Sequence, residues 1–100
     1  MQNTRRSDRK SLVVDVEYES AGGRVKARIN NIGTLGVFIE TDSPLSVGVR
    51  LRLRFTLPGG RMIETDGVVA HRQTGAGMGI AFISTGVEEV EHIRRFIDAG

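Results

Sequence analysis

Apolar and polar residues alternate along most of this chain, and such alternation is typical of strands with one buried face. The clearest run covers residues 49–57, where apolar side chains from Val49 to Leu57 fall on one face and three arginines on the other. Similar runs, separated by turns that contain glycine, predict six strands in all. We expect these strands at 12–18, 24–29, 37–41, 49–57, 62–72 and 78–83.

The connections between these strands also carry information. Residues 30–36 have the composition of a loop punctuated by glycine, and Gly67 is expected to permit a bulge or bend within the fifth strand. Near the C-terminus the period changes, because apolar residues recur at spacings of three and four. This spacing predicts an amphipathic helix over about 86–98.

Short strands with regularly spaced turns are typical of a small barrel or sandwich, and a single terminal helix would cover one opening. The expected fold class is therefore all-β dominated: a six-stranded antiparallel β-barrel with one C-terminal α-helix. A chain of 100 residues with 39% hydrophobic side chains supports one such core. We expect the barrel domain to cover 11–100, after a flexible basic segment at 1–10.

The composition argues against several classes of protein. There is no cysteine, so disulfides and thiolate metal sites are excluded. No apolar run approaches the ~20 residues of a membrane span, and the basic N-terminus lacks the apolar stretch of a signal peptide. We therefore expect a cytoplasmic protein. The two histidines, His71 and His92, stand apart from any metal-ligand spacing, and no serine lies in a nucleophile elbow, so we expect no enzyme and no metal site.

Positive charge is concentrated at the N-terminus. Residues 1–10 contain four basic side chains and one acid, a net charge of +3. The other ninety residues contain ten basic and eleven acidic side chains, a net charge of −1. Such a basic segment is either a solvated tail or a contact for an anion such as nucleic acid, a phosphorylated ligand or a membrane surface.

A second group of arginines, Arg50, Arg52 and Arg54, forms a stripe on the outer face of the fourth strand. It suggests a small nucleic-acid-binding barrel as one possible function. Glu64 and Asp66 lie on the next strand, where they are expected to pair with the stripe. Because aromatic residues for stacking are also scarce, nucleic acid is the last-ranked partner.

Two short motifs resemble those of PilZ domains. Arg5-Arg6-Ser7-Asp8-Arg9, directly before the first strand, looks like the RxxxR motif of that family. Asn31-Ile32-Gly33-Thr34-Leu35-Gly36 resembles its second motif, (D/N)xSxxG. The similarity extends to the pattern of strands and to the closing helix, and so it covers nearly the whole chain.

The resemblance implies a receptor for the bacterial second messenger cyclic di-GMP, which passes the signal to an unidentified effector protein. The arginines would fold over the ligand and bond its phosphates and guanine edges, while Asn31 would bond a guanine from the barrel. Gly36 would allow close approach of the backbone. His71 would either stack on a base or be a half-buried barrel residue. The implied ligand-binding residues are Arg5, Arg6, Arg9, Asn31, Gly33, Gly36 and His71.

The chain departs from the family pattern at Gly33, where the motif usually has serine. Loss of one neutral hydrogen bond costs about 0.5–1.5 kcal/mol, so the substitution is expected to weaken binding without abolishing it. The alternative is a PilZ-fold interaction module that has lost the ligand and acts only as an adaptor. Affinity, stoichiometry, oligomeric state and the regulated process stay open at the level of sequence, with motility regulation among the processes that the family suggests.

Overall fold

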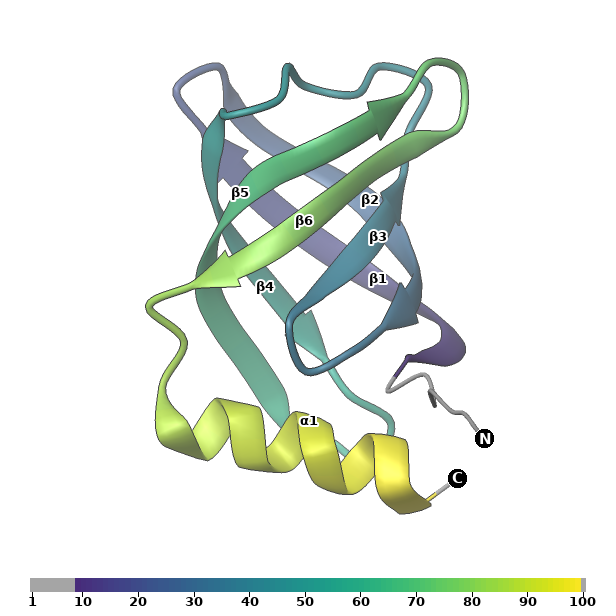
Figure 1. Cartoon of the computed structure of the whole chain (residues 1–100), viewed down its shortest axis with the longest axis vertical. Helices are drawn as coiled ribbons and strands as arrows, with labels where there is room; N and C mark the ends of the chain where they lie inside the picture. Colours follow the sequence, from purple (N-terminus) through teal and green to yellow (C-terminus); the bar gives the residue numbers. More distant parts are fainter. Residues whose placement is uncertain (1–8, 100) are drawn as a thin grey trace, which may run out of the picture.

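A computed structural model describes residues 9–99, which form six strands and one helix (Figure 1). Apart from Arg9, the RxxxR motif lies outside the described residues. The elements in chain order are β1 (Lys10–Ser20), β2 (Gly23–Ile32), β3 (Gly36–Glu40), β4 (Arg50–Thr56), β5 (Met62–Gln73), β6 (Gly77–Ile83) and α1 (Val87–Ala99).

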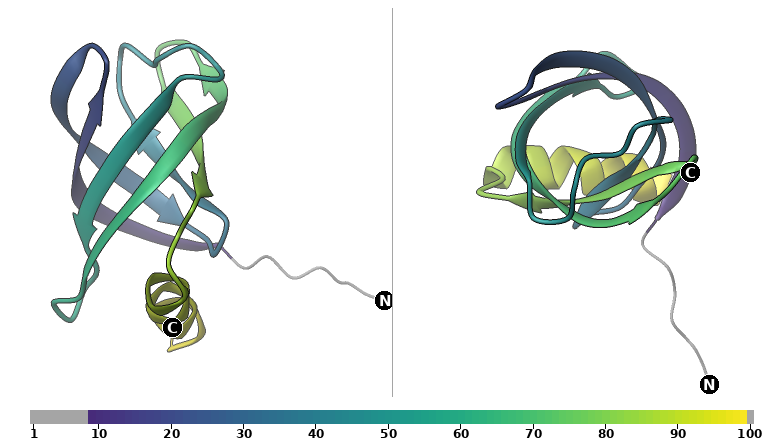
Figure 2. Two further views of the ribbon diagram at one scale, coloured as in Figure 1. Left: turned by 90° about the vertical axis from the view of Figure 1, so that its left-hand side faces the viewer. Right: turned by 90° about the horizontal axis from the view of Figure 1, so that it is seen from above.

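The strands close into an antiparallel barrel in the order β1-β2-β3-β6-β5-β4. The helix α1 lies across one end of the barrel, and the connection from β3 to β4 crosses the opposite end (Figures 1 and 2). This architecture confirms the expected fold class. Closure of the sheet pairs β1 with both β2 and β4, so that neither β1 nor β4 is left as an open edge.

The core lies inside the barrel and follows the alternation of the sequence. On β4, for example, Leu51, Leu53 and Phe55 are buried and the arginines between them are exposed. The helix buries Ile93 completely and packs Phe96 and Ile97 against the barrel. The buried apolar residues are Val16, Tyr18, Ile29, Ile32, Val37, Ile39, Leu51, Leu53, Phe55, Leu57, Ile63, Val69, Met78, Ile80 and Ile93.

Tyr18 brings a hydroxyl group into this core. Its side chain is 3% exposed and hydrogen-bonded to the side chain of Thr41. Burial raises the pKa of Tyr18 above its ordinary value, and the hydrogen bond from Thr41 opposes this only in part. The hydroxyl is therefore held in its neutral form.

Two details of the strands differ from the prediction. The segment 30–36 was expected to be a loop, but β2 continues through Ile32 because residues up to that point pair with both β1 and β3. Gly67 pairs in regular register with Leu51 and Phe82, so the bulge expected there is absent. A Cβ at Gly67 would lie 2.5 Å from Cγ2 of Ile80, which shows that this glycine makes room for a core side chain instead.

The first residue of β1 also contacts the helix. Lys10 Nζ donates a hydrogen bond of 3.2 Å to the carbonyl oxygen of Phe96 and lies 4.5 Å from the centroid of its ring. Carbonyl groups in the last turn of a helix lack intrahelical partners and carry partial negative charge. Since the last turn of α1 contains no basic residue, Lys10 supplies the cation.

Candidate functional site

Two β-bulges turn polar side chains to the outside of the barrel. In β2 the register shifts between Ile29 and Asn31, so that Asn30 is an extra residue relative to β3. In β5 the register shifts between Val69 and His71 relative to β6. Ile29 and Val69 are buried, and strict alternation would point the residues two positions later inward as well. The bulges instead place Asn31 and His71 on the outer face.

These residues form a row across four neighbouring strands. Asn31 pairs with Phe38 of β3, Phe38 pairs with Gly79 of β6, and Gly79 pairs with His71 of β5. Two glycines of β6 lie beneath the rings, with the His71 ring over Gly79 and the Phe38 ring over Gly77. The ring centroids are 6.2 Å apart and the ring planes are tilted by 32°. His71 is exposed, so it is not the half-buried barrel residue that was one of its two interpretations.

Glycines keep this part of the surface flat. A Cβ at Gly79 would overlap the His71 ring, at 2.7 Å from Nδ1 and 2.9 Å from Nε2. A Cβ at Gly36 would overlap the carbonyl oxygen of Ile80 and lie 3.0 Å from its carbon. The first conflict is with a side chain that can rotate. The second is with backbone, so the pairing of β3 with β6 itself requires Gly36.

Arg9 reaches the same surface from the N-terminal side. Its Nε donates a hydrogen bond of 2.7 Å to Oδ1 of Asn31, and its Nη2 donates to the same oxygen. The Asn31 amide nitrogen donates 2.9 Å to Oδ1 of Asn30, whose own amide nitrogen donates 3.0 Å to the Glu40 carboxylate. The last arginine of the basic motif is therefore hydrogen-bonded to the first residue of the second motif.

A pocket of about 370 Å³ lies beside this row. Of the described residues that line it, none is acidic, and Arg9 is a cation at its rim. Leu35, from the turn between β2 and β3, is 77% exposed and adds an apolar edge. The lining residues that carry side-chain chemistry are Arg9, Asn31, Leu35, Phe38 and His71.

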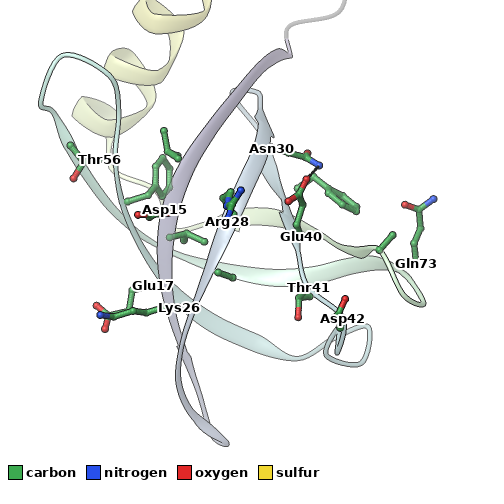
Figure 3. Close-up of a pocket in the computed structure, with 16 residues that line it drawn as sticks. Asp15, Glu17, Lys26, Arg28, Asn30, Glu40, Thr41, Asp42, Thr56 and Gln73 are labelled. Atoms are coloured by element: carbon green, nitrogen blue, oxygen red, sulfur yellow. Dashed lines mark hydrogen bonds between the residues drawn. The ribbon is translucent and has the colours of Figure 1, made fainter.

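A larger hollow of about 1400 Å³ lies over β1, β2 and β3 (Figure 3). Its lining contains four carboxylates and two cations. Such a balance disfavours a doubly charged anion. The smaller pocket is consequently the better candidate for an anionic ligand. The charged residues of the larger hollow are Asp15, Glu17, Glu40, Asp42, Lys26 and Arg28.

Comparison with known families decides the assignment. A family model described as PilZ domain matches residues 3–99. The chain belongs to the PilZ domain family. No curated protein matches the chain by sequence.

Three solved structures share the fold. The Bacillus subtilis inhibitor of motility MotI/DgrA aligns with a TM-score of 0.80 at 22% identity over 99% of this chain and 51% of that chain. The PilZ domain of CeSA from a cellulose-synthesizing bacterium aligns at 0.69 and 18% identity, over 93% and 97% of the two chains. Borreliella burgdorferi PlzA in complex with c-di-GMP aligns at 0.71 and 16%, over 95% and 41%. The chain therefore spans about half the length of MotI.

Five of the residues that were expected to bind the ligand lie in the described part of the chain. Arg9, Asn31, Gly36 and His71 line the small pocket, whereas Gly33 does not. That these residues bind a ligand stays a prediction. The backbone nitrogen of Gly33 donates 2.9 Å to the carbonyl oxygen of Gly36 and closes the turn between β2 and β3. Arg5 and Arg6 lie outside the described residues, so their expected role as ligand contacts stays a prediction.

Two of the three arginines in the β4 stripe, Arg52 and Arg54, form an ion-pair network. Arg52 pairs with Asp66 at 2.9 Å, and Arg54 lies 3.4 Å from Glu64 and 3.6 Å from Glu17. The hydrogen bond to Asp66 raises the pKa of Arg52 above its ordinary value. These pairs confirm the expected cross-strand contacts and offset the charge that nucleic acid would need.

Within residues 9–99, no group of three His, Cys, Asp or Glu side chains is placed to hold a metal ion. The described part of the chain also contains no helix long and apolar enough to cross a membrane.

Sequence reasoning missed three participants in the site: Phe38, Asn30 and Glu40. Phe38 follows an apolar pattern and was counted among the strand residues, whereas Asn30 was assigned to a loop. Their proximity to the pocket depends on the bulge in β2, which is a property of pairing between strands. An Asn-Asn pair beside the second motif was the only local signal.

Proposed function

We propose that this PilZ domain binds cyclic di-GMP at the small pocket and acts as a receptor and adaptor, not as an enzyme. The observation that carries the proposal is the hydrogen bond from Arg9 to Asn31 at the rim of a pocket that has no acidic residue among its described lining. It joins the two motifs at a surface that also offers two rings. The complex of PlzA with c-di-GMP, a protein of the same fold, supports this choice of ligand.

The chemistry of the pocket suits a ligand with two phosphates and two guanines. The guanidinium group of Arg9 offers a planar fork for a phosphate or for the O6 and N7 atoms of guanine. The tilted rings of Phe38 and His71 provide a platform on which a base can stack. A volume of about 370 Å³ accommodates part of such a ligand, and the remainder would lie across the outer face of the barrel.

Gly33 modifies the expected strength of this site. Its position in the second motif usually supplies a hydroxyl group, and here it supplies only backbone. The missing hydrogen bond would weaken binding about threefold to tenfold. Such a loss leaves the arginine contacts in place.

Transmission of the signal would use the junction between the basic segment and β1. Arg9 contacts the pocket, and the next residue, Lys10, contacts the last turn of α1. A ligand that fixes Arg5, Arg6 and Arg9 would therefore act one residue away from the attachment of the helix. We propose that an effector protein in the cytoplasm recognises the resulting surface. The similarity to MotI makes motility a candidate process.

Calorimetry with matched arginine variants tests this proposal. Arg9→Ala removes a contact to phosphate or guanine and is expected to weaken binding by about 2–3 kcal/mol. Arg24→Ala is the control, because Arg24 is an exposed arginine that pairs with Glu17 and Glu19 away from the pocket. Equal affinities for the two variants would contradict the assigned site.

A second candidate function is an interaction module that does not bind cyclic di-GMP. Gly33 favours it, because the residue removes a ligand contact of the second motif. This function predicts that Arg5→Ala and Arg9→Ala leave the cellular phenotype unchanged. A strong phenotype from either substitution, in a protein that remains folded, would argue against it.

A further inference from the structure

Four polar side chains form a continuous line from β3 to the N-terminal segment. Glu40 accepts a hydrogen bond of 3.0 Å from Asn30, which accepts one of 2.9 Å from Asn31. Asn31 in turn accepts from Nε of Arg9 at 2.7 Å. Figure 3 shows the first of these bonds as a dashed line between Asn30 and Glu40.

The chemistry of its two ends fixes the direction of this line. A carboxylate only accepts hydrogen bonds and a guanidinium only donates them. Asn30 must therefore turn its amide nitrogen toward Glu40 and its oxygen toward Asn31. Asn31 must then turn its own nitrogen toward Asn30 and its oxygen toward Arg9. If either amide flipped, it would place two donors against each other on one side and two acceptors against each other on the other side.

The bulge in β2 makes this arrangement possible. Without it, Asn30 and Asn31 would point to opposite faces of the strand, as neighbours normally do. With Asn30 inserted between the paired residues Ile29 and Asn31, both amides lie on the outer face and bond to each other. Glu40 ends β3 on the same face, where it is exposed.

We propose that Asn30 and Glu40 are positioning residues for the guanidinium group of Arg9. They hold the Asn31 oxygen toward Arg9 and so place the guanidinium at the rim of the pocket before the ligand arrives. Neither residue lines the small pocket. The inference rests on the proposed ligand only for its effect on affinity, because the line of hydrogen bonds exists in the protein alone.

Two substitutions at Glu40 separate this role from the effect of charge. Glu40→Ala removes the acceptor, and we expect about threefold to tenfold weaker binding of cyclic di-GMP. Glu40→Gln removes the same negative charge but keeps an oxygen that accepts from Asn30, so the affinity is expected to equal or exceed that of wild type. Charge alone predicts tighter binding of an anion by both variants. Tighter or unchanged binding by Glu40→Ala would overturn the proposal.

A double-mutant cycle with Asn30→Ala tests whether the residues act in line. Once the Asn30 side chain is removed, no hydrogen bonds connect Glu40 to Asn31, and Glu40→Ala should cause no further loss of affinity. Additive losses of affinity in the double variant would contradict the proposal that the two residues act through one line of hydrogen bonds. Both positions are accessible to solvent, so the variants should fold, and circular dichroism checks that they do.

Nuclear magnetic resonance of the free protein tests the line of hydrogen bonds separately from the binding of cyclic di-GMP. The Nε–H signal of Arg9, assigned by its absence in Arg9→Lys, is expected to exchange slowly with water in wild type and in Glu40→Gln. It should exchange faster in Glu40→Ala, while backbone signals of the barrel stay in place. An unchanged exchange rate in Glu40→Ala overturns the proposed positioning role whether or not the protein binds cyclic di-GMP. An absence of binding by wild type overturns the proposed function alone.

Discussion

Replacement of Gly79 by alanine would place a methyl group where the His71 ring now lies. The new Cβ would fall within 2.7 Å of Nδ1 and 2.9 Å of Nε2 of His71, well inside normal contact. His71 is exposed on the outer face, so its ring can rotate away from Phe38 and leave the barrel backbone unchanged. The effect should therefore fall on ligand binding and not on folding.

The expected magnitude follows from the stacking contact that is lost. Stacking of a base on an aromatic side chain contributes about 1–3 kcal/mol, which corresponds to about 5-fold to 150-fold in affinity. Removal of one such contact without a backbone clash should change the free energy of unfolding by no more than about 0.5 kcal/mol. For a domain of this size that is a shift in Tm of about 4 °C or less.

Calorimetry with cyclic di-GMP and a thermal melt measure these two quantities on the same sample. Gly22→Ala serves as the control, because Gly22 is an exposed turn residue whose added Cβ would meet only Ser20 Oγ, at 3.8 Å. Wild-type affinity in a folded Gly79→Ala protein would refute the stacking platform. A large drop in Tm would refute the claim that rotation of the His71 ring makes room for the new Cβ.

Three further substitutions address the fold and the second motif. Gly36→Ala places a Cβ against the backbone of Ile80 and should destabilise the barrel by at least about 1 kcal/mol, seen as a Tm lower by about 4 °C or more; an unchanged melt would show that β3 and β6 can separate. Gly33→Ser restores a hydroxyl group and should tighten binding of cyclic di-GMP about threefold to tenfold, whereas no change would place that hydroxyl outside the site. Because burial raises the pKa of Tyr18, the unfolded chain loses this proton at lower pH than the folded one. Stability from the neutral hydroxyl should thus be complete below about pH 10 and fall as pH rises above it. Denaturant titrations of wild type and Tyr18→Phe should therefore converge at alkaline pH, and parallel curves would contradict the assignment.

The alternation of side chains was sufficient to predict a small barrel or sandwich, because each strand has one buried face. On β4 every second residue is buried, and the arginines between them pair with the acids expected on β5. The terminal helix was predicted within a residue at each end from the spacing of its apolar residues. The burial pattern and the helix depend on the spacing of apolar residues along the local sequence, whereas the ion pairs depend on the alignment of β4 with β5.

The site was harder to predict because its orientation depends on register. Asn31 and His71 point outward only because each strand carries a bulge, and neither bulge lies at Gly67, where the sequence suggested one. Phe38 belongs to the site through its pairing with Gly79, which is 41 positions later in the chain. The motifs identified residues of the candidate site. Their contacts with Phe38, Asn30 and Glu40 depend on pairing between strands and could not be predicted from the motifs.

The most direct test of the proposed ligand site is to locate bound cyclic di-GMP on the barrel by nuclear magnetic resonance. Titration of the ligand into labelled protein should shift the backbone signals of Arg9, Asn31, Phe38, His71 and Gly79. Signals of the β4 arginine stripe and of the turn between β1 and β2 should stay in place. Shifts confined to the stripe or to the larger hollow, or no shifts at ligand concentrations of hundreds of micromolar, would contradict the proposed site.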